Sequence, residues 1–329
     1  MRSHQYQFGM RDLGRDFGPA LGALALLACM LHAGAALGWL PAPRPTLDVD
    51  RTILVHQAES SRRRHSARIV LIGDSSCLMD VMATTLGEVL GEPVLNLATL
   101  SYLDLPTHAA LIQEFARANP GRLKQVVLLM HPESLRLRAV PDYFRRQVRD
   151  FLAGRDSPAK TGAAQWIEEA LGAQRLRGRV LSRAVPWPLP GAYGRFYGFS
   201  RDLEVFLEAN AGSAVDPRRF VPAQERASAE YRLAPRFKIE SRRFRQLLPA
   251  GVRLIVGITP SPASFVLPDH ADRCRSMLRQ WSAWLAADRR LEPLPTVLPD
   301  DQFASRAHLN ARGRVGYTRE LGRALQAGD

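Results

Sequence analysis

Short runs of apolar, largely β-branched residues alternate along this chain with longer stretches in which apolar positions recur at helical spacing. The short runs predict strands at 68–72, 93–97, 125–130, 252–258 and 293–298. The longer stretches predict helices at 78–90, 104–118, 273–287 and 310–326. Continuous apolar strands that alternate with helices are typical of a parallel sheet covered on both faces. We therefore expect a three-layer α/β/α fold with a mostly parallel, flavodoxin-like sheet of about five strands.

One apolar stretch near the N-terminus is much longer than the others. Residues 18–40 contain no formally charged side chain and are followed by Pro41. As a helix this run spans about 34 Å, enough to cross the hydrocarbon core, and Trp39 falls at its end, where interfacial aromatics are common. A cleaved signal peptide is the alternative, since 33–35 reads Ala-Gly-Ala, but its apolar region is normally only about 7–15 residues. We expect an uncleaved transmembrane anchor.

The charges that flank this run bear on membrane orientation. Three arginines precede it and two follow within the next 20 residues, which places the N-terminus inside and the main domain outside. Arg62, Arg63 and Arg64, slightly farther along, argue for the opposite orientation. We expect a single-pass protein of the cell membrane whose main domain is periplasmic or otherwise extracytoplasmic.

The rest of the chain divides by composition. Residues 1–17 form an N-terminal tail, and 41–67 combine prolines, polar residues and an arginine run, as a stalk would. Residues 68–329 are long enough for one large domain. Within it, the alternation of strands and helices breaks down over 132–223, which we interpret as an irregular insertion over the strand ends.

Composition narrows the classes of function. The chain has 329 residues, with 45 basic and 32 acidic side chains and a formal net charge of +13. It carries no zinc-finger or RNA-binding signature, so we expect no nucleic-acid partner, although a basic surface suits an anionic membrane or polymer. Three cysteines make no disulfide framework, and the eight histidines show no metal-binding spacing. No glycine-rich phosphate loop follows a predicted strand, and we expect no metal and no cofactor.

Candidate chemistry begins where the first strand ends, at Gly73-Asp74-Ser75-Ser76. Ligands of open parallel sheets bind at the carboxyl ends of the strands, and a serine there lies beside the amides of the next helix, which can stabilise an oxyanion. The alternative is that Asp74, Ser75 or Ser76 only caps that helix. A second polar stretch, His308-Leu309-Asn310-x-x-Gly313, precedes the last predicted helix.

Together, the Gly-Asp-Ser turn and the late His-Leu-Asn-x-x-Gly stretch resemble the SGNH/GDSL hydrolase superfamily. The resemblance implies that Ser75 is the nucleophile and His308 the general base. It also implies an oxyanion site near Ser75 and Ser76, completed by the amide of Ala98, which stands about where the family has a glycine. The family's asparagine after the third strand is absent, so that donor is either missing or replaced by His131.

The acid of the triad departs from the family pattern. The superfamily usually places an aspartate three residues before the histidine, and Ser305 occupies that position. Asp301 or Asp300 are the nearest carboxylates that can move in, and we take Asp301 as the candidate acid.

The anchor, the early serine and the late histidine also resemble membrane-bound members that assist O-acylation of extracytoplasmic polysaccharides beside a multi-spanning acyltransferase of the MBOAT type. The implied function is an acyl esterase or O-acyltransferase that acts on a glycan through a serine nucleophile. One alternative is a catalytically weak or inactive partner of a membrane-bound O-acyltransferase. Another is an anchored α/β domain of unrelated function.

Overall fold

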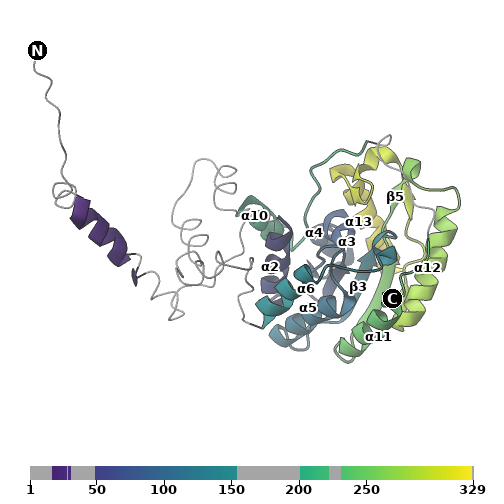
Figure 1. Ribbon diagram of the computed structural model, residues 1–329. Coiled ribbons are helices and arrows are strands. Elements are labelled where there is room, and N and C mark those ends of the chain that lie inside the picture. Colours follow the sequence, from purple (N-terminus) through teal and green to yellow (C-terminus); the bar gives the residue numbers. More distant parts are fainter. Residues whose placement is uncertain (1–16, 28, 31–48, 154–200, 222–230, 328–329) are drawn as a thin grey trace, which may run out of the picture. The chain divides into compact units, whose positions relative to one another are not determined.

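The computed structural model describes residues 17–27, 29–30, 49–153, 201–221 and 231–327 (Figure 1). The chain divides into two units, one of residues 1–47 and 158–199 and one of residues 48–157 and 200–329. In the first unit the described residues are helical. Across the described residues, no helix combines the length and apolar character needed to cross a membrane. Residues 28 and 31–40 of the expected anchor lie outside that part of the chain.

The second unit contains a central sheet of five parallel strands in the order β2-β1-β3-β4-β6. These strands are β1 (Ile69–Gly73), β2 (Val94–Asn96), β3 (Gln125–Met130), β4 (Arg253–Ile258) and β6 (Arg289–Arg290). All residues of β1, β2 and β3 are buried, as their continuous apolar runs predict. The strand order reverses at β1, so the carboxyl ends of β1 and β3 flank the position where open sheets bind ligands.

The fifth strand is not the predicted one. We expected it at 293–298, but only β7 (Val297–Leu298) forms there, and it pairs with β5 (Ser261–Pro262) outside the central sheet. The edge position beside β4 is taken by β6 instead. Its two arginines are partly exposed, so an edge strand of this kind has no apolar run from which it can be recognised.

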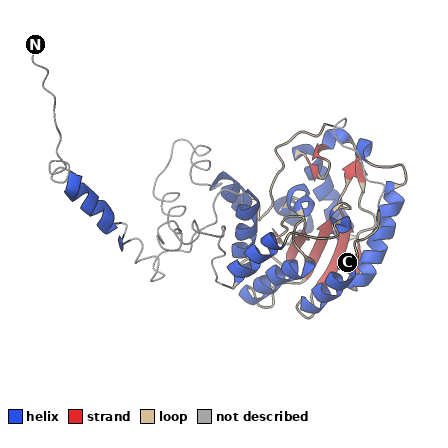
Figure 2. Cartoon of the chain, in the orientation of Figure 1, coloured by secondary structure: helices blue, strands red, loops and turns tan. Residues whose placement is uncertain are grey.

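Helices lie around the strands in two groups (Figure 2). One group contains α3 (Ser75–Asp80), α4 (Ala83–Leu90) and α13 (Ala311–Gln326). The other contains α5 (Leu105–Ala118), α11 (Arg236–Leu247) and α12 (His270–Leu285). The sequence pattern locates α5, α12 and α13 to within a few residues and misses α11, which buries only Phe237, Ser241 and Phe244.

The predicted helix 78–90 is divided in the structure. It begins earlier, at Ser75, and is interrupted between α3 and α4, where Val81 adopts an extended conformation. The backbone N–H of Met82, which lies at the interruption, donates to Thr318 Oγ1 on α13 over 3.0 Å. A side chain distant in sequence therefore provides the acceptor for this N–H. The break allows α3 to end beside the short strand β9 (His308–Leu309).

The stalk expected over 41–67 is wrong from Val49 onward. Helix α2 (Val49–Arg62) packs against α5 and α6 (Asp142–Leu152), and it buries Ile53, Leu54 and Ala58. The exposed arginines 62–64 lie at the C-terminal end of this folded helix, so an arginine run does not by itself indicate a linker. The part of the expected stalk before Val49 lies outside the described residues.

The insertion expected over 132–223 is described at both ends. It contains the short helix η1 (Ser134–Arg136), α6 and α10 (Arg201–Ala209), whereas residues 154–200 lie outside the described part. After α10 the chain runs beside β2, where the Asn96 N–H donates to the Ala211 carbonyl over 2.9 Å. Gly212 has φ +86°, and a Cβ there would lie 2.0 Å from the Asn96 carbonyl oxygen. Only glycine permits this approach, which brings the following residues toward the carboxyl end of the sheet.

Candidate active site

The turn after β1 fixes the position of Ser75. Gly73 has φ +149°, and a Cβ there would lie 1.8 Å from the Leu129 carbonyl oxygen, so this position requires glycine. Asp74 caps α3, because its Oδ1 accepts the Ser76 N–H over 3.0 Å. Ser75 is the first residue of α3 and is half-buried. The capping role was one of our alternatives for this turn, and Asp74 performs it while Ser75 remains available for chemistry.

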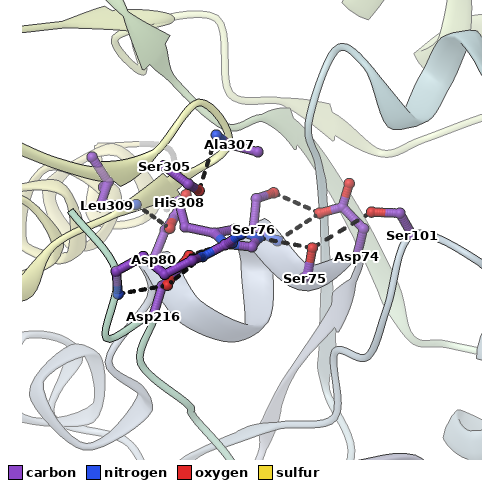
Figure 3. Close-up of polar contacts among 11 residues, drawn as sticks. Asp74, Ser75, Ser76, Asp80, Ser101, Asp216, Ser305, Ala307, His308 and Leu309 are labelled. Carbon is purple, nitrogen blue, oxygen red and sulfur yellow. Dashed lines mark hydrogen bonds and ion pairs between the residues drawn. The ribbon is translucent and has the colours of Figure 1, made fainter. Parts of the chain in front are cut away.

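His308 lies directly against this serine. Its Nε2 is 2.9 Å from Ser75 Oγ (Figure 3). His308 and Leu309 form β9, which pairs with β8 (Phe303–Ser305) in a small antiparallel sheet. Asp80, at the end of α3, accepts the Leu309 N–H over 2.7 Å. Because Ser75 opens α3 and Asp80 closes it, one short helix positions both the serine and the strand of the histidine. Burial raises the pKa of Asp80 well above its usual value.

The other ring nitrogen of His308 contacts a carboxylate that the sequence did not indicate. His308 Nδ1 is 2.7 Å from Asp216 Oδ2, and the Asp216 side chain is almost fully buried. Arg218 adds bonds from its backbone N–H and its guanidinium, including a 2.7 Å contact to Oδ2. Burial opposes ionisation of Asp216, but the hydrogen bonds from His308 and Arg218 outweigh it and lower the pKa of Asp216 far below its usual value.

This charge state determines the histidine tautomer. An ionised carboxylate can only accept hydrogen bonds, so Nδ1 of His308 carries a proton and donates it to Asp216. The neutral ring then has an unprotonated Nε2, which accepts the hydroxyl proton of Ser75. The three side chains thus form a continuous serine–histidine–aspartate hydrogen-bond chain, in the polarity that a general-base mechanism needs.

The expected acid, Asp301, does not contact the histidine. Its side chain is 61% exposed and pairs with Arg312 at 3.2 Å. The alternative, Asp300, accepts the Ser264 N–H over 2.9 Å. Ser305, at the position where the superfamily has its aspartate, accepts the backbone N–H two residues further on. The carboxylate that contacts His308 comes instead from the insertion, 92 residues before the histidine.

Two of the predicted oxyanion donors are already engaged elsewhere. The Ser76 N–H donates to Asp74, and the buried Ser76 hydroxyl lies between Asp74 Oδ1 at 2.5 Å and the donating Thr259 hydroxyl at 2.7 Å. The Ala98 N–H donates to Asn96 Oδ1 over 2.9 Å. Both amides therefore donate to acceptors within their own turns, and the Ser76 hydroxyl also bonds to Thr259, which follows β4.

His131 is also occupied. Its backbone N–H donates to Asp74 Oδ2 over 2.9 Å, and its Nδ1 accepts the Glu133 N–H over 3.3 Å. The remaining ring nitrogen, Nε2, is then the protonated one and donates to Ser261 Oγ over 3.0 Å. Burial, together with neighbouring positive groups, lowers the pKa of His131 well below its usual value. His131 is a neutral residue of the buried framework and does not replace the missing asparagine donor.

A different hydroxyl lies beside Ser75. Ser101, on the loop after β2, has its Oγ 3.5 Å from Ser75 Oγ. The buried Ser134, which opens η1 after β3, donates its hydroxyl to Ser101 Oγ over 3.1 Å. The sequence does not indicate either serine, because neither belongs to a recognisable motif.

The described residues contain no group of three or more histidine, cysteine, aspartate or glutamate side chains that could hold a metal ion. Comparison of the chain with protein-family models, with curated proteins and with solved structures gave no match.

Proposed function

We propose that the chain is an SGNH-like serine esterase or O-acyltransferase with Ser75 as nucleophile, His308 as general base and Asp216 as the acid. The observation that carries this proposal is the chain of contacts from Ser75 Oγ to His308 Nε2 at 2.9 Å and from Nδ1 to Asp216 at 2.7 Å. The sheet order β2-β1-β3-β4-β6 has β2 at one edge, next to β1, and the other strands on the opposite side of β1. This order is that of flavodoxin-like folds, and it supports an SGNH-type domain.

The proposed reaction starts with the Ser75 hydroxyl. Its oxygen attacks the carbonyl carbon of an acyl ester, and its proton passes to His308 Nε2, while Asp216 stabilises the imidazolium. The tetrahedral oxyanion collapses, the bond to the leaving alkoxide breaks, and the alkoxide takes the proton from His308. An acceptor hydroxyl then gives its proton to His308 and attacks acyl-Ser75, which restores the serine. Water as the acceptor yields a free acid, and a glycan hydroxyl yields an acylated glycan.

The role of Ser75 as nucleophile is tested by covalent labelling of the full-length protein with a fluorophosphonate. Ser75→Ala should abolish labelling, because the reagent bonds to an activated serine oxygen. Ser76→Ala is the matched control, since Ser76 is adjacent, buried and bonded to Asp74. Labelling that persists in Ser75→Ala would refute the nucleophile, and no labelling of the wild-type protein would favour the inactive-partner alternative.

The proposed substrate and location depend on the resemblance and on the uncharged run 18–40. We place the catalytic domain outside the cell membrane, where it acts on an extracytoplasmic glycan beside a multi-spanning acyltransferase of the MBOAT type. An alkaline-phosphatase fusion after Leu47 should be active and should stay in the membrane fraction. An inactive fusion would reverse the orientation, and an active fusion found only in the soluble periplasm would mean that the segment is cleaved.

A further inference from the structure

An acyl-transfer site needs hydrogen-bond donors at the position where the oxyanion develops. Three donors that the resemblance suggested are committed to other acceptors. The Ser76 N–H is bonded to Asp74, the Ala98 N–H to Asn96, and the His131 ring N–H to Ser261. His131 is thus not available as a side-chain donor, and any such donor comes from another residue beside Ser75.

Ser101 has the required position. Its Oγ is 3.5 Å from Ser75 Oγ, and Figure 3 shows Ser75 between His308 on one side and Ser101 on the other. Once Ser75 has attacked, its oxygen and the oxyanion are bonded to the same carbon. A donor on the side away from the base is then within reach of the oxyanion, for which about 2.7–3.1 Å is the productive distance.

The hydroxyl proton of Ser101 is also directed toward this position. The Ser75 proton is committed to His308 Nε2, so in the Ser75–Ser101 contact Ser101 is the donor. Ser134 donates its hydroxyl proton to the Ser101 oxygen over 3.1 Å. The Ser101 oxygen thus acts as an acceptor toward Ser134, and the proton of Ser101 can point at Ser75. Ser134 is buried, so its hydroxyl is held in place by the surrounding fold.

We propose that the Ser101 hydroxyl is the side-chain donor of the oxyanion site, in place of the absent asparagine, and that Ser134 is the positioning residue that orients it. Ser101 forms and breaks no covalent bond. Its hydrogen bond shifts from the neutral Ser75 oxygen to the developing oxyanion, where it becomes charge-assisted and stronger. This inference rests on the proposed function, because it requires Ser75 to be the nucleophile.

Kinetics of the full-length protein with p-nitrophenyl acetate test the proposal. Ser101→Ala should lower kcat by about 10²-fold or more, as loss of one oxyanion donor does, with KM within about threefold of wild type. Ser134→Ala should lower kcat by about tenfold, the effect of one weakened hydrogen bond. The double variant should be no slower than Ser101→Ala alone, because Ser134 acts through Ser101. Ser101→Thr keeps the hydroxyl and should retain at least about a tenth of the wild-type kcat.

The matched control is Ser276→Ala, which removes an exposed serine on α12 and should leave kcat unchanged. The rate of fluorophosphonate labelling of Ser75 is the second measurement, because the phosphonyl oxygen occupies the oxyanion position and no turnover is needed. A folded Ser101→Ala variant with wild-type kcat and labelling rate would overturn the inference. So would additive losses in the double variant. A Ser75→Ala variant that still turns over at the wild-type rate would instead overturn the proposed function, so the two failures are distinguishable.

Discussion

The proposed acid, Asp216, offers the sharpest test of the site. Asp216→Asn keeps the size of the side chain and removes its charge. The asparagine amide can also donate to His308 Nδ1, which forces the ring proton onto Nε2. In that tautomer Nε2 no longer accepts the Ser75 proton. The substitution therefore removes the charge that stabilises the imidazolium and favours the wrong form of the base.

The size of the effect follows from the charges around the ring. Unit charges about 4 Å apart interact by about 4 kcal/mol at an effective dielectric constant of 20, which suits the nearly buried Asp216–His308 pair. Arg218 opposes this, since its Nη2 lies 3.5 Å from His308 Nδ1, but its side chain is 65% exposed, and water reduces the repulsion to about 1 kcal/mol. The remaining 3 kcal/mol or so corresponds to about 10²-fold in rate, and the tautomer change can extend the loss to about 10⁴-fold.

The assay is the steady-state kcat for p-nitrophenyl acetate, with circular dichroism to confirm folding. Asp301→Asn is the matched control, because it neutralises an exposed aspartate that pairs with Arg312, and it should keep the wild-type rate. Ser305→Asp should bring no gain, since the ring already has its carboxylate. If folded Asp216→Asn keeps kcat within fivefold of wild type, the assignment of the acid is wrong. If Asp301→Asn is the slow variant, the loop before the histidine supplies the charge after all.

Three further predictions concern the framework around the site. Asp74→Asn should lower the free energy of unfolding in urea by about 2–3 kcal/mol, because Asp74 accepts three hydrogen bonds and an amide group repels at least one of those donors. Gly212→Ala should lower both stability and kcat, since its Cβ would meet the Asn96 carbonyl, whereas Gly251→Ala, with φ +77° and open space around it, should leave kcat unchanged. Burial lowers the pKa of His108 from 6.5 to about 4, so between pH 7 and pH 5 the unfolded chain binds a proton that the folded chain does not. His108 alone should therefore lower stability by about 2 kcal/mol over this range, and His108→Phe should remove that share of the fall.

The sequence predicts those parts of the fold that depend on local patterns. Buried strands such as β1 and β3 carry continuous apolar runs, and α13 begins at an asparagine whose side chain caps it, so both kinds of element are recognisable one segment at a time. The fifth strand, β6, is held by backbone hydrogen bonds to β4 and leaves its arginines at the edge. The sequence also does not predict helix α2, because its short apolar face is outweighed by the arginines that follow it.

The candidate site shows the same division. Ser75 and His308 lie in local motifs, and the structure brings the two together. Asp216 has no motif, and its place depends on where the chain runs after α10. Ser101 and Ser134 are ordinary loop and helix-start serines whose significance lies only in their distance from Ser75 and from each other. Residues defined by contacts across the fold cannot be read from spacing along the chain.

Buried carboxylates explain why the site depends on such long-range contacts. Asp74 binds the turn after β1 to the end of β3, and Asp80 binds α3 to the strand of His308. Asp216 is the third, and it is the one whose charge is stabilised, by His308 and by Arg218. Burying a carboxylate is costly unless its hydrogen bonds are satisfied. Asp74 and Asp216 accept hydrogen bonds at both oxygens, whereas Asp80 Oδ2 has no partner among the described residues and burial raises the pKa of Asp80. The insertion is thus part of the proposed catalytic site, since without the segment that follows α10 the histidine would lack its ionised partner.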